Sequence, residues 1–421
     1  MIRYIVMFVL SASIWSGGTL YVSAQTDQTL YAFHNAPLFD GKFGKVALAQ
    51  SAIEKASGEC GGVGVEVNGE FGASTSEAIK ALADCGALKN RLPASSTAFH
   101  GELTQDLWKI LLPEAAPPSV EERAQTLVLT YEATDYDKLE WNFCQNKPFW
   151  SPAQPDKPCY TNDPRSYITW GPRGATAGGG REVQWIIARV DRGNPALVDQ
   201  AFGDEADVVR SLLKINEEST RRLLCAVFND EQRRVKWTNG FAKFGTFPEV
   251  RIAYQLHYAS LASDGSKMRA LYGIYQRLGI PPTEIDYGFF LDRATHTSTP
   301  EDPKEAASRI RDILLSKHLS LSPSNVRRVF SSAFPTANQT ADRLGRDVAF
   351  FVDATSEAGL TGGEIKAWRA RGRLRASDVG LSDSRPAPTL SIAKSIEAPA
   401  FNVTLSPLPA CPASVLHPIH P

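Results

Sequence analysis

The chain has 421 residues, of which 43% are hydrophobic and 22% are charged, so it is long enough to bury more than one core. Its formal net charge of −1 at pH 7 excludes a whole-protein field that would hold nucleic acid or an anionic surface, and we expect no nucleic-acid partner. A local acidic cleft is compatible with this balance.

The first 24 residues have the three parts of a secretory signal peptide. Arg3 supplies the positive end, an apolar run of eleven residues extends from Ile5 to Trp15, and Val22-Ser23-Ala24 is a small-x-small cleavage site. The run is shorter than the roughly 20 apolar residues that span a bilayer. We therefore predict an exported protein, periplasmic or secreted, with no membrane span after cleavage. An uncleaved anchor is the alternative.

Six cysteines remain after this cleavage, and an even number in an oxidising compartment predicts disulfides. The two predicted pairs are local ones, Cys60 with Cys85 and Cys144 with Cys159. Cys225 and Cys411 are left over, and their pairing would tie the tail to the body. The chain has no Cys-x-x-Cys or His-Glu-x-x-His spacing, so we expect no metal and no other cofactor.

Two copies of a turn-and-helix pattern follow the signal. Residues 40–44 (DGKFG) and residues 68–72 (NGEFG) each precede an apolar helical stretch. An Asn/Asp-Gly turn places the backbone where glycine fits most easily, the Phe packs beneath it, and a Ser or Thr caps the helix. A degenerate third copy lies at residues 101–104. We predict a small three-helix bundle over residues 28–114, followed by a Pro-rich linker.

The second copy resembles the central motif of the peptidoglycan-binding domains that are appended to wall hydrolases, which reads Asp/Asn-Gly-x-Phe-Gly-x-x-Thr. Gln50 and residues 108–111 (WKIL) fit the flanking positions, and the resemblance covers residues 38–113. It implies peptidoglycan or a related amino-sugar polymer as the partner. We interpret Phe71 and Gly72 as residues that build the fold, because an aromatic beside a glycine at a turn is packing chemistry.

Beyond the linker, helical patterns dominate residues 119–382, with a strand-and-turn stretch at residues 166–180. We predict a mainly α (α+β) fold, in which the small bundle is joined to a two-lobed helical domain with a β-hairpin. Residues 383–421 are rich in Pro, Ser and Ala without a period, which predicts a flexible tail.

Glu132 is the candidate catalytic acid. It ends an amphipathic helix whose residues 127–131 (LVLTY) place an apolar wall behind it. A desolvated carboxyl keeps its proton, as a proton donor requires, and the negative end of a helix acts in the same direction. An ordinary solvated acid at a helix end is the alternative interpretation.

Residues 163–171 (DPRSYITWG) place an Asp six positions before a Thr, on the rise into a strand that ends in glycine. This stretch resembles the Asp-x5-Thr-x-Gly hairpin of phage-type lysozymes and of chitosanases with the lysozyme fold, in which a Glu at a helix end precedes the hairpin. The resemblance implies Glu132 as the acid, Asp163 as the water-activating base and Thr169 as its partner. These families invert the anomeric centre, which implies roughly 6.5–9.5 Å between the two carboxyls. For Asp163, an Asx turn before Pro164 is the alternative.

The interval of 31 residues between Glu132 and Asp163 is longer than those families usually show, and part of it resembles an insertion. Other side chains near the hairpin therefore compete for its roles. The second-choice catalytic residues are Asp135, Asp137 and Thr176. The candidate substrate-binding residues are Trp141, Trp170 and Arg173. Core packing is the alternative for both tryptophans.

Together these patterns predict a secreted, monomeric, muramidase-like hydrolase that cleaves the β-1,4 glycosidic bonds of peptidoglycan. A chitosanase is the first alternative, and it would need further carboxylates along the cleft for a cationic chain, for which Asp135, Asp137 and Glu140 are the candidates. A wall-binding protein that keeps the fold without turnover is the second alternative.

Overall fold

The computed structural model describes residues 27–60, 64–132, 134–143, 166–263, 267–296, 300, 302–334, 341–351, 359–390 and 399–411. The predicted signal peptide, Asp163 and the cysteines Cys144 and Cys159 lie outside these residues. Over the described part the chain is mainly helical with three small sheets, which confirms the predicted α+β class.

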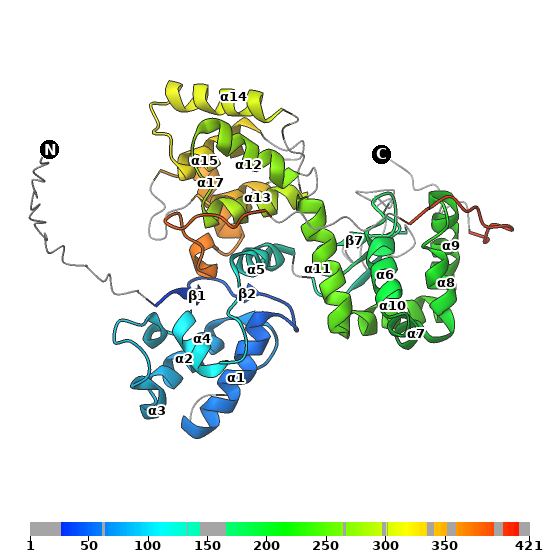
Figure 1. Cartoon of the computed structure of the whole chain (residues 1–421), viewed down its shortest axis with the longest axis horizontal. Coiled ribbons are helices and arrows are strands. Elements are labelled where there is room, and N and C mark those ends of the chain that lie inside the picture. Colours follow the sequence, from blue (N-terminus) through cyan, green and yellow to red (C-terminus); the bar gives the residue numbers. More distant parts are fainter. Residues whose placement is uncertain are drawn as a thin grey trace, which may run out of the picture.

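The N-terminal module contains the predicted bundle, with two short antiparallel sheets (Figure 1). Its strands are β1 (Thr29–Tyr31), β2 (Leu38–Phe39), β3 (Glu70–Phe71) and β4 (Leu103–Thr104). Its helices are α1 (Lys45–Cys60), α2 (Ala73–Asp84), the short α3 (Gly86–Lys89), the 3-10 turn η1 (Thr97–His100) and α4 (Gln105–Leu111). β1 pairs with β4 and β2 pairs with β3, so each sheet joins segments distant in sequence.

The two turn copies contact each other, which gives the repeat a structural reason. The Asp40 N–H donates to the Gly69 carbonyl at 2.9 Å. Gly41 and Gly69 both have positive φ, at 79° and 78°, a region that favours glycine. The Gln50 Oε1 accepts from the N–H groups of Asn68 and Gly69 at 3.1 and 2.9 Å, and so holds the second turn. These residues of the motif therefore build the module.

The predicted helix caps are confirmed in the third copy and wrong in the second. Thr104 caps α4, because its Oγ1 accepts the Leu107 N–H at 3.2 Å. α2 begins after Gly72 without a side-chain cap. Thr75 lies instead in the first turn of α2, where its buried hydroxyl accepts from Gln50 Nε2 at 3.0 Å.

The first core joins this module to helices from later in the chain. They are α5 (Val120–Glu132), α12 (Lys267–Leu278), α13 (Glu284–His296), α14 (Pro303–Ser316), α15 (Pro323–Ala333), α16 (Ala341–Val348), α17 (Gly362–Ala370) and the 3-10 turn η4 (Ala376–Val379). Leu127 of α5 and Phe289 of α13 belong to the same buried cluster as the module. Arg123, only 2% exposed, donates to the Val379 carbonyl at 2.8 Å. The linker at residues 115–118 thus does not separate two cores, contrary to the predicted division there.

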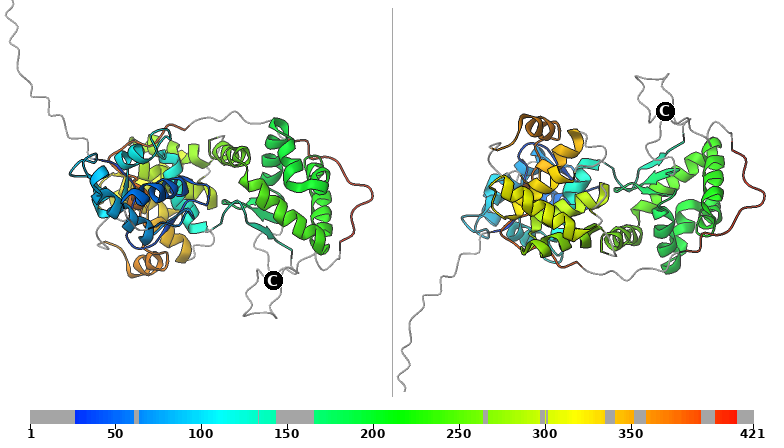
Figure 2. Two further views of the ribbon diagram at one scale, coloured as in Figure 1. Left: turned by 90° about the horizontal axis from the view of Figure 1, so that it is seen from below. Right: turned by 90° about the horizontal axis from the view of Figure 1, so that it is seen from above.

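The second core forms a separate lobe, here called the second lobe (Figure 2). It contains β5 (Leu139–Trp141), β6 (Ile168–Trp170), β7 (Ala175–Thr176), α6 (Glu182–Gly193), α7 (Ala196–Phe202), the 3-10 turn η3 (Gly203–Glu205), α8 (Ala206–Ser211), α9 (Glu217–Asn229), α10 (Glu231–Thr246) and α11 (Pro248–Ser263). The predicted hairpin is part of a three-stranded antiparallel sheet in the order β5-β6-β7. The chain enters this lobe after α5 and leaves it through α11.

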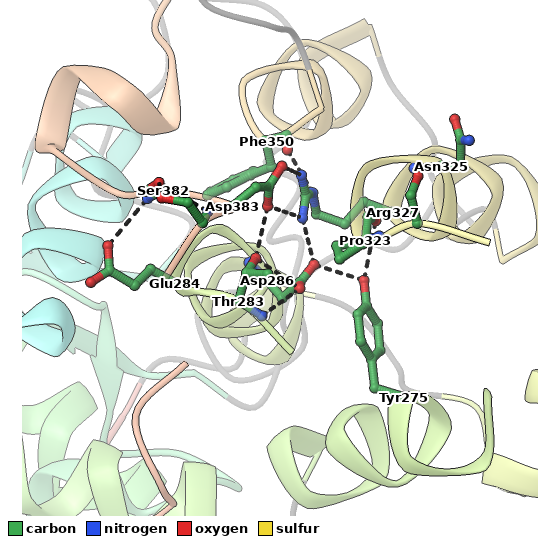
Figure 3. Close-up of polar contacts among 12 residues, drawn as sticks. Tyr275, Thr283, Glu284, Asp286, Pro323, Asn325, Arg327, Phe350, Ser382 and Asp383 are labelled. Carbon is green, nitrogen blue, oxygen red and sulfur yellow. Dashed lines mark hydrogen bonds and ion pairs between the residues drawn. The ribbon is translucent and has the colours of Figure 1, made fainter. Parts of the chain in front are cut away.

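Two described stretches of the predicted tail are bound to the body. Asp383 accepts from Arg327 Nη2 of α15 at 2.7 Å, and Arg327 Nη1 also donates to Asp286 of α13 at 2.6 Å, as Figure 3 shows. Further along, Cys411 is bonded to Cys225 of α9, the pair left over in the sequence. These contacts differ from the loose tail that the composition predicts.

The predicted disulfide between Cys60 and Cys85 is also present, and it joins the ends of α1 and α2 with Cα atoms 5.8 Å apart. Disulfides are compatible with an exported protein, since they persist in oxidising compartments. Among the described helices, none is both long and apolar enough to traverse a bilayer.

Candidate functional site

Glu132 is the last residue of α5, and its position follows from how that helix is built. The helix starts with a reciprocal cap, in which the Glu122 N–H donates to Ser119 Oγ at 3.2 Å and the Ser119 N–H donates to Glu122 Oε2 at 2.8 Å. Its apolar side chains, from Leu127 to Tyr131, are buried. Glu132 therefore lies where the chain leaves the first core for the second lobe (Figure 1).

The Glu132 carboxylate is held by an arginine. Arg346 of α16 donates from Nη1 to Glu132 Oε1 at 2.6 Å, and the Glu132 side chain is 25% exposed. The same guanidinium donates from Nε to Asp292 of α13 at 3.0 Å. Burial alone would lower the pKa of Arg346, but Asp292 and Glu132 raise that pKa above its ordinary value. The helix end is apolar as predicted, yet the carboxyl itself meets a cation, which corrects the predicted apolar niche.

Behind this arginine the charged contacts continue through buried side chains. Arg343 donates to Asp292 and, from Nη2 at 2.7 Å, to Asp347 Oδ1. Arg293 donates from Nε to the same Asp347 oxygen at 3.0 Å. Within the described residues, three guanidinium groups meet three carboxylates, so the formal charges cancel. We call this set the Arg346 network, and its members are Glu132, Asp292, Arg293, Arg343, Arg346 and Asp347.

One face of the three-stranded sheet carries polar side chains. Glu140 of β5 lies opposite Thr169 of β6, and Thr169 lies opposite Thr176 of β7, so the three share a face. Thr169 Oγ1 accepts from Asn142 Nδ2 at 2.7 Å. Thr176 Oγ1 donates to Glu182 Oε2 at 2.5 Å. The two threonines that the sequence selected are thus brought together on one surface.

Glu140 is a catalytic candidate that sequence reasoning missed, since it entered only as an extra carboxylate for chitosan. Its side chain is half-buried, and burial raises the pKa of Glu140 above its ordinary value. It forms no hydrogen bond or ion pair with any other described residue. Such a carboxyl is suited to carry a proton. The available signal was its polar position between the two apolar ones of β5.

Asp135 and Asp137 lie close to Glu132 in sequence, but both contact the N-terminal module. Asp135, 4% exposed, accepts the Lys42 N–H at 2.9 Å. Asp137 accepts from Lys42 Nζ at 2.7 Å. Both carboxylates therefore bind the first turn copy to the second lobe. This structural role differs from the second-choice catalytic role predicted for them.

Both predicted substrate-binding tryptophans are core residues. Trp170 is 0% exposed and donates from Nε1 to the Tyr136 carbonyl at 2.8 Å. Trp141 is 4% exposed and donates from Nε1 to Thr238 Oγ1 at 3.2 Å. A buried ring has no face left for a sugar, so these two assignments were wrong and core packing is the correct interpretation. Arg173, the third, lines a cavity between the N-terminal module and the second lobe.

The candidate site thus consists of Glu132 with the Arg346 network and of the polar face of the β5–β7 sheet. Comparison of the chain with protein-family models, with curated proteins and with solved structures finds no match. Support for a function therefore comes from the geometry and chemistry of these residues and from the motifs in the sequence.

Proposed function

We propose that the protein is an exported, muramidase-like hydrolase that cleaves the β-1,4 glycosidic bonds of peptidoglycan with inversion at the anomeric carbon. The observation that carries the proposal is how Glu132 is held: a buried arginine network includes this partly exposed carboxyl, which lies where the chain passes between the two cores. The polar face of the β5–β7 sheet supports it, as does the turn motif of the N-terminal module.

Glu132 acts as the general acid in this mechanism. Its proton passes to the glycosidic oxygen as the bond from that oxygen to C1 breaks, while a water attacks C1 from the opposite face and gives a proton to Asp163. Asp163 lies outside the described residues, so its role is supported by the sequence resemblance alone. Thr169, whose hydroxyl is held by Asn142, helps to orient the water.

Arg346 is a positioning residue for the acid. It donates to Glu132 Oε1 and so fixes the direction of the carboxyl. An arginine that served Glu132 alone would favour the carboxylate and oppose proton donation. Arg346 is shared with Asp292, so its attraction for Glu132 is divided.

The available carboxylates favour peptidoglycan over chitosan as the substrate. A chitosanase needs acidic side chains along its cleft for a polycation, but Asp135 and Asp137 are engaged with Lys42. Glu140 and Glu182 are the acidic groups described on the polar sheet face. Chitosan hydrolysis is thus the alternative activity to measure, and wall binding without turnover is the other.

The test compares the mature protein with Glu132→Gln, Glu140→Gln and Glu121→Gln, and measures sugar release from purified sacculi and from chitosan. Glu121 is exposed in the first turn of the same helix, so E121Q is a matched control. We expect full activity in E121Q and a loss of about 10²-fold or more in E132Q, with binding to sacculi retained.

Each other outcome points to a specific revision. Full activity in E132Q would overturn the assignment of the acid, and a larger loss in E140Q than in E132Q would move that role to Glu140. Release from chitosan alone would make the protein a chitosanase. Binding to sacculi without release by the unmutated protein would make it a wall-binding protein.

A further inference from the structure

A cavity of about 300 Å³ lies where the N-terminal module meets α5 and the second lobe. The first turn copy forms one wall of this cavity with Gly41, Phe43 and Gly44. Leu129 of α5 belongs to a second wall, and Arg173 and Arg251 belong to a third. The volume is at the lower end of the range for small-molecule sites. Leu129 precedes Glu132 by three residues, a rise of about 4.5 Å along the helix.

Two arginines line the cavity without an acidic partner. The Arg173 guanidinium lies over the Tyr258 ring, 5.0 Å from its centroid. The Arg251 guanidinium lies 4.3 Å from the centroid of Phe43 and donates to the Gly245 carbonyl at 3.1 Å. Neither arginine forms an ion pair with any described residue. Burial lowers the pKa of both, which marks partly desolvated cations that a bound anion would stabilise.

The acids that line the same cavity are engaged elsewhere. Asp40 accepts from Thr126 Oγ1 at 2.9 Å and from the Val46 N–H at 3.2 Å. Glu122 lies 3.7 Å from Lys45 Nζ, at ion-pair distance. The two carboxylates therefore contact groups of the N-terminal module and α5. The positive charges of Arg173 and Arg251 are not paired with these acids and could attract an anionic ligand.

Gln125 of α5 adds an unused acceptor to the cavity lining. Its Oε1 is buried and has no hydrogen-bond partner among the described residues. A buried acceptor without a donor is costly, and a ligand amide or hydroxyl would supply that donor. The cavity thus offers two cations for an acid group and one acceptor for a neutral polar group.

We propose that this cavity binds an amino sugar that carries a carboxylate, the chemistry of an N-acetylmuramic acid residue. Its carboxylate contacts Arg173 and Arg251, and its amide or a hydroxyl donates to Gln125. The proposal rests on the proposed function, which makes the wall glycan the substrate, and adds to it an anion-binding site apart from the catalytic carboxyls. A chitosan chain, which carries amines in place of carboxylates, would be repelled by the same two cations.

The test measures, by calorimetry on the mature protein, the binding of N-acetylmuramic acid and of N-acetylglucosamine, which lacks the carboxylate. The variants are Arg173→Gln, Arg251→Gln and, as a matched control, Arg192→Gln, because Arg192 is exposed at the end of α6 in the same lobe. We expect the acid sugar to bind about tenfold or more tightly than the neutral one. R173Q and R251Q should remove this preference, and R192Q should keep it, with thermal unfolding showing that every variant is folded.

Equal affinity for the two sugars, or an unchanged preference in both R173Q and R251Q, would overturn the proposal. Binding of inorganic phosphate without binding of the acid sugar would overturn it as well. Its failure is distinguishable from that of the proposed function. Binding of the acid sugar by a protein that releases nothing from sacculi removes the hydrolase and leaves this site, whereas release without the preference removes the site and leaves the hydrolase.

Discussion

Two clusters of buried arginines in this chain form the same kind of ion pair with carboxylates but hold different parts of the molecule. In the Arg346 network the last carboxyl is Glu132, at the passage between the two cores. In the other cluster Arg327, 1% exposed, joins Asp286 of α13 to Asp383 of the tail (Figure 3). Both clusters end on a partly exposed carboxyl, so exposure alone does not mark a functional site.

What separates the two clusters is how each terminal carboxyl is used. Asp383 accepts from Arg327 on both of its oxygens, at 2.9 and 2.7 Å, and from Thr283 Oγ1 at 2.8 Å. Both carboxylate oxygens of Asp383 therefore bind the tail to the body of the protein. Glu132 is 25% exposed and lies where the chain passes from the first core to the second lobe. The hydrolase proposal requires the two clusters to respond differently to substitution. If substitutions in both clusters change stability and leave kcat unchanged, Glu132 has a structural role as Asp383 does.

The largest effect is expected for Arg346→Met, a neutral side chain of similar reach. The substitution removes the contact from Arg346 Nη1 that orients Glu132, and we expect kcat on soluble peptidoglycan fragments to fall by about 10²-fold. Arg346→Lys, which keeps the charge, should restore part of kcat. A fall in Tm with unchanged kcat and pH profile would make Glu132 structural.

Asp286→Asn should act on stability and leave turnover unchanged. The buried Arg327 would lose a carboxylate partner at 2.6 Å, and breaking such a pair costs about 3–5 kcal/mol. Unfolding in denaturant measures this loss, and kcat is measured well below the Tm of the variant. A large fall in kcat at preserved stability would contradict the assignment of this cluster to the tail.

Asp40 shows what a buried carboxyl does when it has no arginine among the described residues. Burial raises the pKa of Asp40 from 3.8 to about 6. Because the folded pKa lies above the unfolded one, the stabilisation from its proton is complete below about pH 4 and is lost as the pH rises through about 6. Asp40→Asn should therefore gain stability relative to the unmutated protein between pH 4 and pH 7, by up to about 3 kcal/mol. Parallel free energies of unfolding across this range would contradict the argument.

The smallest effect is expected for Asp383→Asn. Its side chain is 42% exposed, so water screens the ion pair with Arg327, and we expect a loss of about 1 kcal/mol or less. Limited proteolysis should cut more readily near residue 383, because the tail loses a contact. A Tm decrease as large as that of D286N would show that burial is not what separates the two acids.

Local features were predictable from the sequence, because short segments determine them. The turn at residues 68–72 needs a glycine with positive φ and a polar partner, and both are visible in the motif. The burial of Trp141 and Trp170 was also readable, since each alternates with a polar neighbour on its strand. Leu139 and Ile168 lie at the same alternation and mark the core face. Of the two interpretations given for these tryptophans, core packing is therefore correct and stacking on a sugar ring is wrong.

Long-range features were not predictable from one sequence. Arg346 lies 214 residues from Glu132, and nothing in either local pattern indicates the other. The predicted boundary between two cores at residues 115–118 was wrong for a related reason. A Pro-rich linker suggests that its two sides are separate, and the sequence does not show that they pack against each other. The three consecutive apolar residues 127–129 were the available signal that α5 is buried on more than one side.

The first core is completed by segments far apart in the chain, which bears on how the chain folds while it is being synthesised. The Ala32 N–H donates to the Asp378 carbonyl of η4 at 2.8 Å. The segment at β1 therefore bonds to a residue that is synthesised almost 350 residues later. At about 5–20 residues per second, ribosomes need roughly 12–50 s to pass from the end of α5 to η4. During that delay the early helices lack the later segments against which they pack in the folded protein. The same interdependence argues against grafting the N-terminal module onto another protein as a portable adaptor.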